Sequence, residues 1–178
     1  MTGVNTRAAL HEHLAVGDHD GLCKRVVTWA STGDQHFAWA AHGLPFGASP
    51  QALHDGSSGP HGSRRVFGVH ELADGPLVGY AELVDIDRPN LTACIGRLIV
   101  DPVYRGRGLG SAGVRLLVAE AFRTDLQRVE VRLPVTNQPA LRAYRQAGFV
   151  IEATLEDAWH RNGEFGSMYL LARTNRVM

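Results

Sequence analysis

The middle of the chain shows the alternation of apolar and polar residues that is typical of β-strands. Residues 65–72 and 77–87 form two such runs, and turn-forming residues at 74–76 separate them. A turn this short predicts an antiparallel hairpin. A second turn at 88–90 precedes the apolar run 91–100, so the pattern predicts a meander of three antiparallel strands.

Beyond this meander the period of the pattern changes to that of a helix. Residues 111–123 place apolar side chains three and four positions apart, and an apolar strand is predicted at 129–135. Because a helix separates this strand from the preceding one, we expect the two strands to be parallel neighbours. A second helix at 139–148 and a final antiparallel pair at 149–155 and 164–171 complete the pattern.

The amino-terminal region is less regular. Moderate helix signals occur at 6–16 and 22–29. Residues 56–63 are rich in glycine and serine, which predicts a mobile surface loop and makes it a candidate lid. No internal repeat is visible, and 178 residues suit a single domain.

Composition excludes several classes of function. Eighteen Lys and Arg balance eighteen Asp and Glu, so no global charge favours nucleic acid or an anionic membrane. No apolar run approaches the length of a membrane span, and the amino terminus lacks the pattern of a signal peptide. The two cysteines form no disulfide framework, so we expect a cytoplasmic protein. Nine histidines without ligand spacing give no reason to expect a metal.

The segment 101–110 carries the strongest chemical signal. Gly106, Gly108 and Gly110 allow a tight turn that gathers backbone N–H groups at the start of the helix, where the helix dipole favours an anion. Arg105 and Arg107 add positive charge and forked donors suited to a diphosphate. We therefore predict a phosphate site, with a plain glycine-rich connection as the alternative.

A dinucleotide-binding fold is an alternative interpretation of the same glycine-rich segment. Residues 108–113 satisfy GxGxxG, and Glu130 follows at a spacing suited to a ribose contact. However, in that fold the first glycine closely follows a strand, and the strands before the motif form βαβ units rather than a meander. A Rossmann-type oxidoreductase is therefore disfavoured.

Two motifs together resemble the GNAT superfamily of N-acetyltransferases. Arg105-x-x-Gly108-x-Gly110 resembles its pyrophosphate signature, and residues 137–149, from Asn137 to the Gly-Phe pair, resemble its second signature. The resemblance covers about 66–173. It implies an α+β (α/β) fold with a mixed central sheet, an antiparallel amino-terminal meander, splayed strands and flanking helices. Residues 1–178 would form one domain, with a variable acceptor-side region at 1–64 and a cofactor-binding core at 65–173.

The resemblance implies acetyl-CoA as cosubstrate, no metal, and direct attack of an amine on the thioester in a ternary complex. The strand residues before the loop would bind the pantetheine arm through their backbone, with the strands splaying at Gly96 or Val100. A non-catalytic CoA-binding sensor remains the alternative. The cofactor-binding residues implied are Leu98, Ile99, Val100, Arg105, Gly106, Arg107, Gly108, Leu109, Gly110, Ser111, Asn137 and Tyr144.

Two residues are candidates for proton transfer. Tyr144 matches the family tyrosine that protonates the departing thiolate, with a core tyrosine as the alternative. Glu82 is the one charged residue on an otherwise apolar face of the run 77–87, which makes it a candidate base. Its alternative is a structural ion pair, with Arg97 as the suggested partner. An acyl-carrying Cys94 is disfavoured because no histidine is placed in the sequence to activate it.

The carboxyl-terminal segments 148–155 and 159–163 resemble the branch of ribosomal-protein N-terminal and small-amine acetyltransferases. Glu156 and Asp157 stand where that branch often has a basic residue, so the acceptor stays open between a small-molecule and a peptide amine. A homodimer is also left open, and no nucleic acid or membrane partner is expected.

Overall fold

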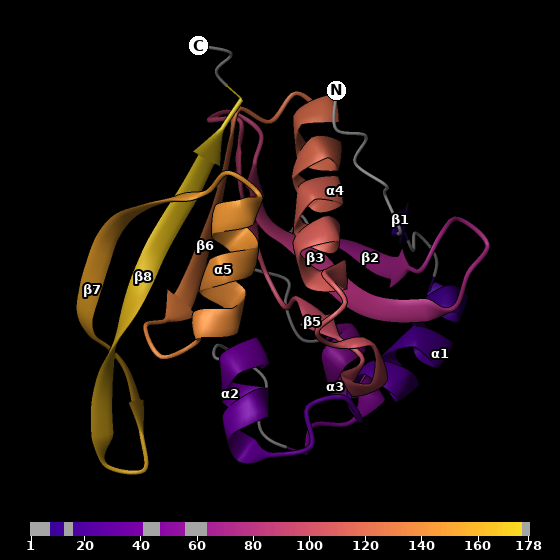
Figure 1. Ribbon diagram of the computed structural model, residues 1–178, viewed down its shortest axis with the longest axis horizontal. Coiled ribbons are helices and arrows are strands. Elements are labelled where there is room, and N and C mark those ends of the chain that lie inside the picture. Colours follow the sequence, from indigo (N-terminus) through magenta and orange to yellow (C-terminus); the bar gives the residue numbers. More distant parts are fainter. Residues whose placement is uncertain (1–7, 13–15, 41–46, 56–63, 176–178) are drawn as a thin grey trace.

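The computed structural model describes residues 8–12, 16–40, 47–55 and 64–175 (Figure 1). Its centre is an eight-stranded sheet with the order β1-β2-β3-β4-β6-β8-β7, in which β5 pairs with β3. The strands are β1 (Ala9–Glu12), β2 (Arg65–His70), β3 (Leu77–Asp87), β4 (Thr92–Ile95), β5 (Ile99–Val100), β6 (Arg128–Pro134), β7 (Val150–Arg161) and β8 (Glu164–Thr174). The helices are α1 (Val16–Val26), α2 (Gly33–Ala40), α3 (Pro50–Asp55), the short 3₁₀ helix η1 (Pro102–Tyr104), α4 (Leu109–Arg123) and α5 (Gln138–Gln146).

The strand pairing confirms the predicted meander. Strands β2, β3 and β4 are antiparallel neighbours, and β6 pairs in parallel with β4 across the crossover helix α4, as expected. The final pair of strands is also confirmed, although β7 continues to Arg161, beyond its predicted end. Strand β8 lies between β6 and β7, so the last hairpin extends the sheet on the side opposite the meander.

The sheet splits where a single strand was predicted at 91–100. Residues 96–98 break this run into β4 and β5, and β5 pairs only with β3. The parallel ladder between β4 and β6 covers Thr92–Cys94, so β6 continues toward Pro134 without β5 beside it. A side chain at Gly96 would bring its Cβ within 3.0 Å of Val84, so glycine allows this close crossing. The break lies at one of the two positions where splaying is expected.

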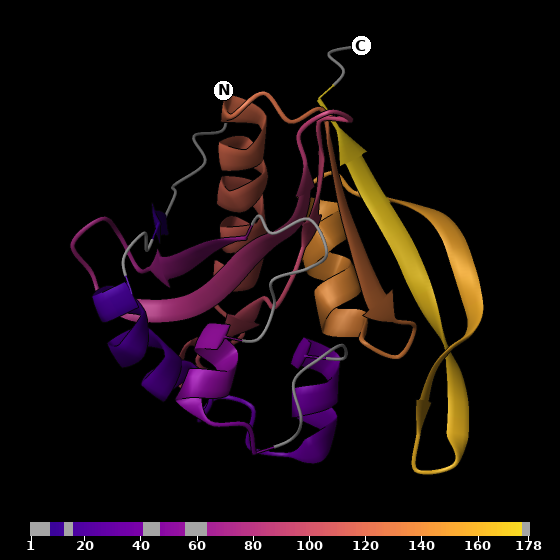
Figure 2. The same cartoon turned by 180° about the vertical axis from the view of Figure 1, so that it is seen from behind.

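The two faces of β3 pack against different helices. Ala81 and Leu83 point into the main core together with α4, whereas Tyr80 points into a second apolar cluster that includes Val26 of α1 and Leu53 of α3. Helices α4 and α5 accordingly lie in front of the sheet in Figure 1, and the view from behind shows α1 and α3 on the other side (Figure 2).

The amino-terminal predictions need correction. The helix signal at 6–16 is wrong over Ala9–Glu12, because this segment forms β1 and adds to the edge of the sheet by antiparallel pairing with β2. Tertiary pairing overrides a weak local helix preference here. The second signal is displaced, since α1 spans Val16–Val26, and α2 and α3 were not predicted. The predicted loop and candidate lid at 56–63 lies outside the described residues.

Candidate active site

The glycine-rich loop between β5 and α4 is held in a defined shape. The Asp101 carboxylate accepts a hydrogen bond from the Val103 N–H at 3.0 Å and so caps η1. Gly106 and Gly108 both have φ of 78°, in the left-handed region that favours glycine. Gly108 is the N-cap of α4, and no side chain caps this helix start. The loop therefore delivers an uncapped helix start to the surface.

Backbone donors gather at this helix start. The first bond that α4 makes to its own cap runs from the Ala112 N–H to the Gly108 carbonyl at 3.0 Å. In any α-helix the N–H groups before that one have no partner within the helix, and they point out of its positive end. Those of Leu109, Gly110 and Ser111 are therefore the natural partners of a phosphate.

A groove of about 380 Å³ opens between the start of α4 and one face of α5. Its lining includes many of the predicted cofactor-binding residues, namely Val100, Arg105, Gly106, Gly108, Leu109, Gly110 and Ser111. Leu98, which precedes β5, Ile99 of β5 and Arg107 of the loop do not line it, and neither do Asn137 and Tyr144. The structure thus brings the loop and the strand end together around one groove.

The opposite wall of the groove was not predicted. Pro139, Arg142, Ala143 and Gln146 of α5 line it, together with Tyr104 of η1. The Ser111 hydroxyl donates to the Gln146 side chain at 2.7 Å and so ties the two helices together. These α5 positions are spaced three and four apart, so the helical period could have identified this wall once α4 was known to face it.

The two loop arginines make contacts within the protein. Arg105 donates from Nε to the Val100 carbonyl at 3.0 Å and from Nη2 to the Trp29 carbonyl at 2.8 Å. It therefore joins the loop both to β5 and to the segment after α1. Arg107 donates to the Val103 carbonyl at 3.3 Å, and its guanidinium lies 5.0 Å from the centre of the Tyr104 ring.

Tyr144 lies in the core of the molecule. Its side chain is buried and packs edge-on against Phe149, with ring centres 5.3 Å apart. Burial raises the pKa of the Tyr144 phenol well above its usual range, so this side chain stays protonated at neutral pH. This placement matches the packing alternative of the sequence analysis, and the role of proton donor stays a prediction. Asn137 caps α5 by accepting a hydrogen bond from the Ala140 N–H at 3.2 Å.

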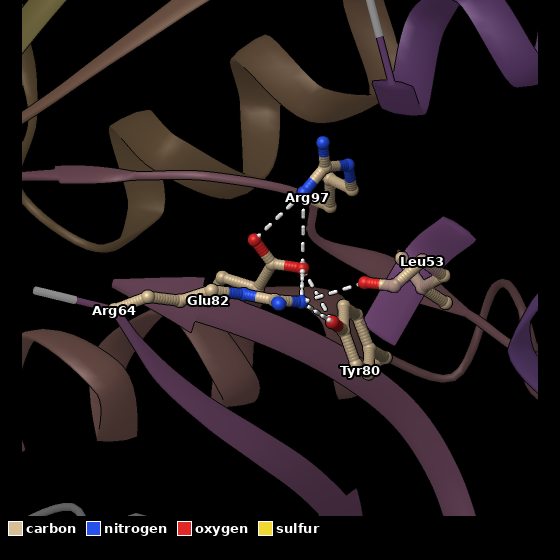
Figure 3. A network of polar contacts seen from close by, with 5 residues as sticks. All are labelled: Leu53, Arg64, Tyr80, Glu82 and Arg97. Carbon is tan, nitrogen blue, oxygen red and sulfur yellow. Dashed lines mark hydrogen bonds and ion pairs between the residues drawn. The ribbon is translucent and has the colours of Figure 1, made fainter. Parts of the chain in front are cut away.

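Glu82 lies at the centre of a buried polar network on β3 (Figure 3). Its side chain is fully buried and forms ion pairs with Arg97 at 3.0 Å and with Arg64 at 2.7 Å. The Tyr80 hydroxyl donates to the same carboxylate, and Arg64 also donates to the Leu53 carbonyl at 3.1 Å. Burial, followed by the charge of Glu82, raises the pKa of Tyr80 well above its usual range, so the phenol remains a donor.

This network joins the elements that meet where the sheet splits. Arg97 lies between β4 and β5, Arg64 directly precedes β2, and Leu53 belongs to α3. Two guanidinium groups bind this carboxylate through charge-assisted hydrogen bonds. The ion pair with Arg97 that the sequence left open is therefore present. The role of Glu82 as a base stays a prediction, and its partners argue for a structural role at the bend.

A second cavity, of about 500 Å³, lies beyond the start of α5, between α2 and the turn of the β7–β8 hairpin. We call it the hairpin pocket. Phe37 and Trp159 meet edge-on in its wall with ring centres 5.0 Å apart, and Arg161 forms an ion pair with Asp34 at 2.8 Å. Its lining residues are Asp34, Gln35, Phe37, Ala38, Pro134, Thr136, Asn137, Pro139, Trp159, Arg161, Asn162 and Glu164. Pro139 lines both cavities, so they are neighbours.

Cys94 is a poor candidate for an acyl-carrying nucleophile. Burial raises the pKa of the Cys94 thiol to about 11, which leaves little of the nucleophilic thiolate at neutral pH. Across the residues that the structure describes, no group of three or more His, Cys, Asp and Glu side chains is arranged to hold a metal ion. None of the described helices has both the length and the apolar character that a membrane crossing requires.

The comparison with known proteins now identifies the family. Residues 36–149 match the Acetyltransferase (GNAT) family, and this segment includes the glycine-rich loop, the groove and Glu82. The chain belongs to the GNAT family. It is thus an N-acetyltransferase of a family that uses acetyl-CoA, which confirms the resemblance carried by the two sequence motifs.

Sequence relatives support this assignment. An L-amino acid N-acetyltransferase of Escherichia coli is 33% identical over 114 residues, which cover 60% of this chain and 68% of the relative. A spermidine N(1)-acetyltransferase of the same species is 30% identical over 104 residues, covering 58% of this chain and 54% of the relative. The match to the second relative thus spans only about half its length. Both names describe transfer to small amines.

A solved structure supports the fold over nearly the whole chain. The spermidine N-acetyltransferase of Vibrio cholerae, determined with CoA and spermine, superposes with a TM-score of 0.73 at 20% identity. The superposition covers 96% of each chain. At this identity the likeness shows the fold alone, and it confirms the predicted mixed sheet with flanking helices.

Proposed function

We propose that the chain acetylates a primary amine by direct transfer, with acetyl-CoA in the groove between α4 and α5 and the amine in the hairpin pocket. The observation that carries this proposal is the glycine-rich loop between β5 and α4, which offers backbone donors at the end of a groove that begins beside Val100. The neighbouring hairpin pocket supplies room for the second substrate.

The groove would hold the cofactor by its phosphates and its arm. The N–H groups at the start of α4 would bind the diphosphate, and Arg105 would add a charged donor from the same loop. The pantetheine arm would run along Leu98–Val100 where β5 diverges from β6, because backbone groups on that side have no neighbouring strand. The thioester would then lie near the split in the sheet.

The reaction would proceed in one transfer step. The neutral amine nitrogen attacks the thioester carbonyl carbon, the C–S bond breaks, and the acetyl group passes to nitrogen. The CoA thiolate leaves and takes up a proton, and the new amide loses one. Tyr144 is the proposed donor of the first proton, on the strength of its match to the family motif. A backbone N–H of β5 would stabilise the oxyanion that forms during attack.

Glu82 is proposed as a positioning residue rather than the proton acceptor. Both arginine partners bind its carboxylate, and Arg97 lies in the bend that leads into β5. The network would thereby hold Leu98–Val100 at the angle that the arm requires. The acceptor would lose its proton to water or to a group outside this network.

The direct test is a panel of amines incubated with acetyl-CoA while free thiol is measured, with CoA binding followed separately by calorimetry. We expect amine-dependent thiol release that stays within the classes of small amines. CoA binding without release on any amine would favour the sensor alternative, and absence of CoA binding would overturn the assignment of the groove. A cytoplasmic location and a homodimer stay predictions, the latter to be checked by size-exclusion chromatography with light scattering.

A further inference from the structure

The hairpin pocket has features that select among amines. We infer that it favours an acceptor with one positive charge and an apolar body about the size of an aromatic ring, and that it disfavours polyamines. This inference rests on the proposed function, since it concerns the pocket assigned above to the amine. Three observations support it: the aromatic wall, the rigidity of that wall, and the balance of charge around it.

The wall of the pocket is aromatic and apolar. Phe37 from α2 and Trp159 from β7 meet edge-on, and Pro134 and Pro139 contribute further apolar surface near the start of α5. Aromatic side chains provide large apolar contact areas, and ring–ring contacts add to the stabilisation from burial alone. An alkyl chain with several charges would leave this surface without a suitable partner.

The Trp159 ring packs against a glycine on the neighbouring strand. Trp159 and Gly166 are cross-strand partners in the hairpin, and a Cβ at Gly166 would lie 2.1 Å from the ring. The indole therefore lies against Gly166, in space that the side chain of any other residue would occupy. A wall with a fixed ring is organised before the ligand arrives, which lowers the entropic cost of binding.

The charges around the pocket nearly cancel. Asp34 is held by Arg161 at 2.8 Å, and the Arg161 guanidinium also lies 5.4 Å from the centre of the Phe37 ring. Among the lining residues, this leaves Glu164 as the carboxylate outside that ion pair. One carboxylate can balance one ammonium group, whereas a polyamine brings several charges that each lose hydration on entry.

The first experiment compares three amines at saturating acetyl-CoA. Phenethylamine has one charge and a ring, butylamine has one charge and no ring, and spermidine has several charges. We expect kcat/KM for phenethylamine to exceed that for spermidine by about tenfold or more, with butylamine between them, as the burial of a ring predicts. A higher kcat/KM for spermidine would overturn the inference and leave the proposed function intact. Failure of all three with CoA bound would count against the proposed function itself.

Substitutions of the two aromatic wall residues test whether the selectivity among amines arises in the hairpin pocket. Trp159→Ala and Phe37→Ala should each lower kcat/KM for phenethylamine by about tenfold, with a much smaller loss for butylamine and an unchanged KM for acetyl-CoA. Phe165→Ala is the matched control, because Phe165 lies in the same hairpin, is 64% exposed and does not line the pocket. Equal losses for both amines in Trp159→Ala would overturn the role of the ring.

Arg161→Gln tests the charge balance by making the pocket more favourable for a polyamine. Removing this guanidinium frees the Asp34 carboxylate and makes the pocket more acidic. We expect kcat/KM for spermidine to rise by about threefold relative to that for phenethylamine, because the pocket can then balance a second charge and the exposed Asp34 carboxylate is screened by solvent. An unchanged ratio would show that Asp34 and Arg161 take no part in the selection and would overturn the charge argument.

Discussion

The groove and the hairpin pocket are neighbours that are built in opposite ways. The groove takes its loop wall from one continuous segment, Val100 to Ser111, and three glycines, Gly106, Gly108 and Gly110, line it. The hairpin pocket takes its wall from α2, the β6–α5 connection and the β7–β8 hairpin, and none of the described residues that line it is a glycine. They share Pro139.

Under the proposed function, this difference separates cofactor binding, which is the same for every amine, from recognition of the amine, which varies. Backbone N–H groups bind a phosphate whatever the side chains are, provided that the turn keeps its shape. A pocket made of side chains can change its ligand by single substitutions while the sheet stays the same. The relatives fit this view, since proteins named for amino acids and for spermidine each match more than half of this chain.

The largest effect is expected at the turn that shapes the groove. Gly108→Val should weaken CoA binding by about 1,000-fold, since about three charge-assisted hydrogen bonds of about 1.5 kcal/mol each would be misplaced. Gly163→Val is the matched control, because Gly163 also has a positive φ, of 83°, and open space around it, yet lies in the hairpin turn. Calorimetry on both folded variants tests this. Equal CoA affinities in the two would show that the groove does not depend on its backbone.

The next effect concerns turnover rather than binding. Tyr144→Phe keeps the ring that packs against Phe149 and removes the hydroxyl, so kcat should fall by about 100-fold with little change in the affinity for acetyl-CoA. Circular dichroism and thermal unfolding should match the unchanged protein. If kcat is unaltered with a good amine, Tyr144 belongs to the core and the thiolate takes its proton from water.

A smaller loss is expected at the network beneath the split in the sheet. Glu82→Gln removes the charge that Arg64 and Arg97 share, so the free energy of unfolding should fall by about 3 kcal/mol and kcat/KM by about tenfold. A positioning role predicts the same fractional loss from pH 6 to pH 9. Recovery of activity at high pH, where free amine predominates, would instead identify Glu82 as the base.

The smallest effect is expected at Arg105. Arg105→Ala should weaken CoA binding by about fivefold, because two of the Arg105 N–H groups already donate to the Val100 and Trp29 carbonyls. Binding of an acetyl-pantetheine fragment, which lacks the phosphates, should change less. An equal loss for both ligands would mean that Arg105 acts only by holding the loop against β5.

These contrasts also explain what the sequence could and could not predict. The loop at 101–110 is a local motif whose shape follows from a turn and a helix start, so its position at an anion-binding type of helix start was predictable. The hairpin pocket depends on a contact between Phe37 and Trp159, which are far apart in the sequence. No local sequence pattern predicts such a contact. The same holds for β1, whose strand conformation depends on β2 as a partner.

Glu82 illustrates an intermediate case. Strand alternation identified it as an unusual charge on an apolar face, and Arg97 was the suggested partner. Arg64 and Tyr80 were not identified, because their approach depends on α3 and on the start of β2. A periodic pattern thus identifies a buried charge, whereas the full set of its partners requires the packed structure.

The shared Pro139 has a consequence for inhibitor chemistry. Because one residue lines both cavities, a single molecule that joins CoA to an aromatic amine through a short linker could fill both at once. Once its CoA end is bound, the tethered amine experiences an effective concentration in the millimolar range, so the conjugate would bind more tightly than either half. The linker length that gives the tightest conjugate would measure the path between the cavities in solution.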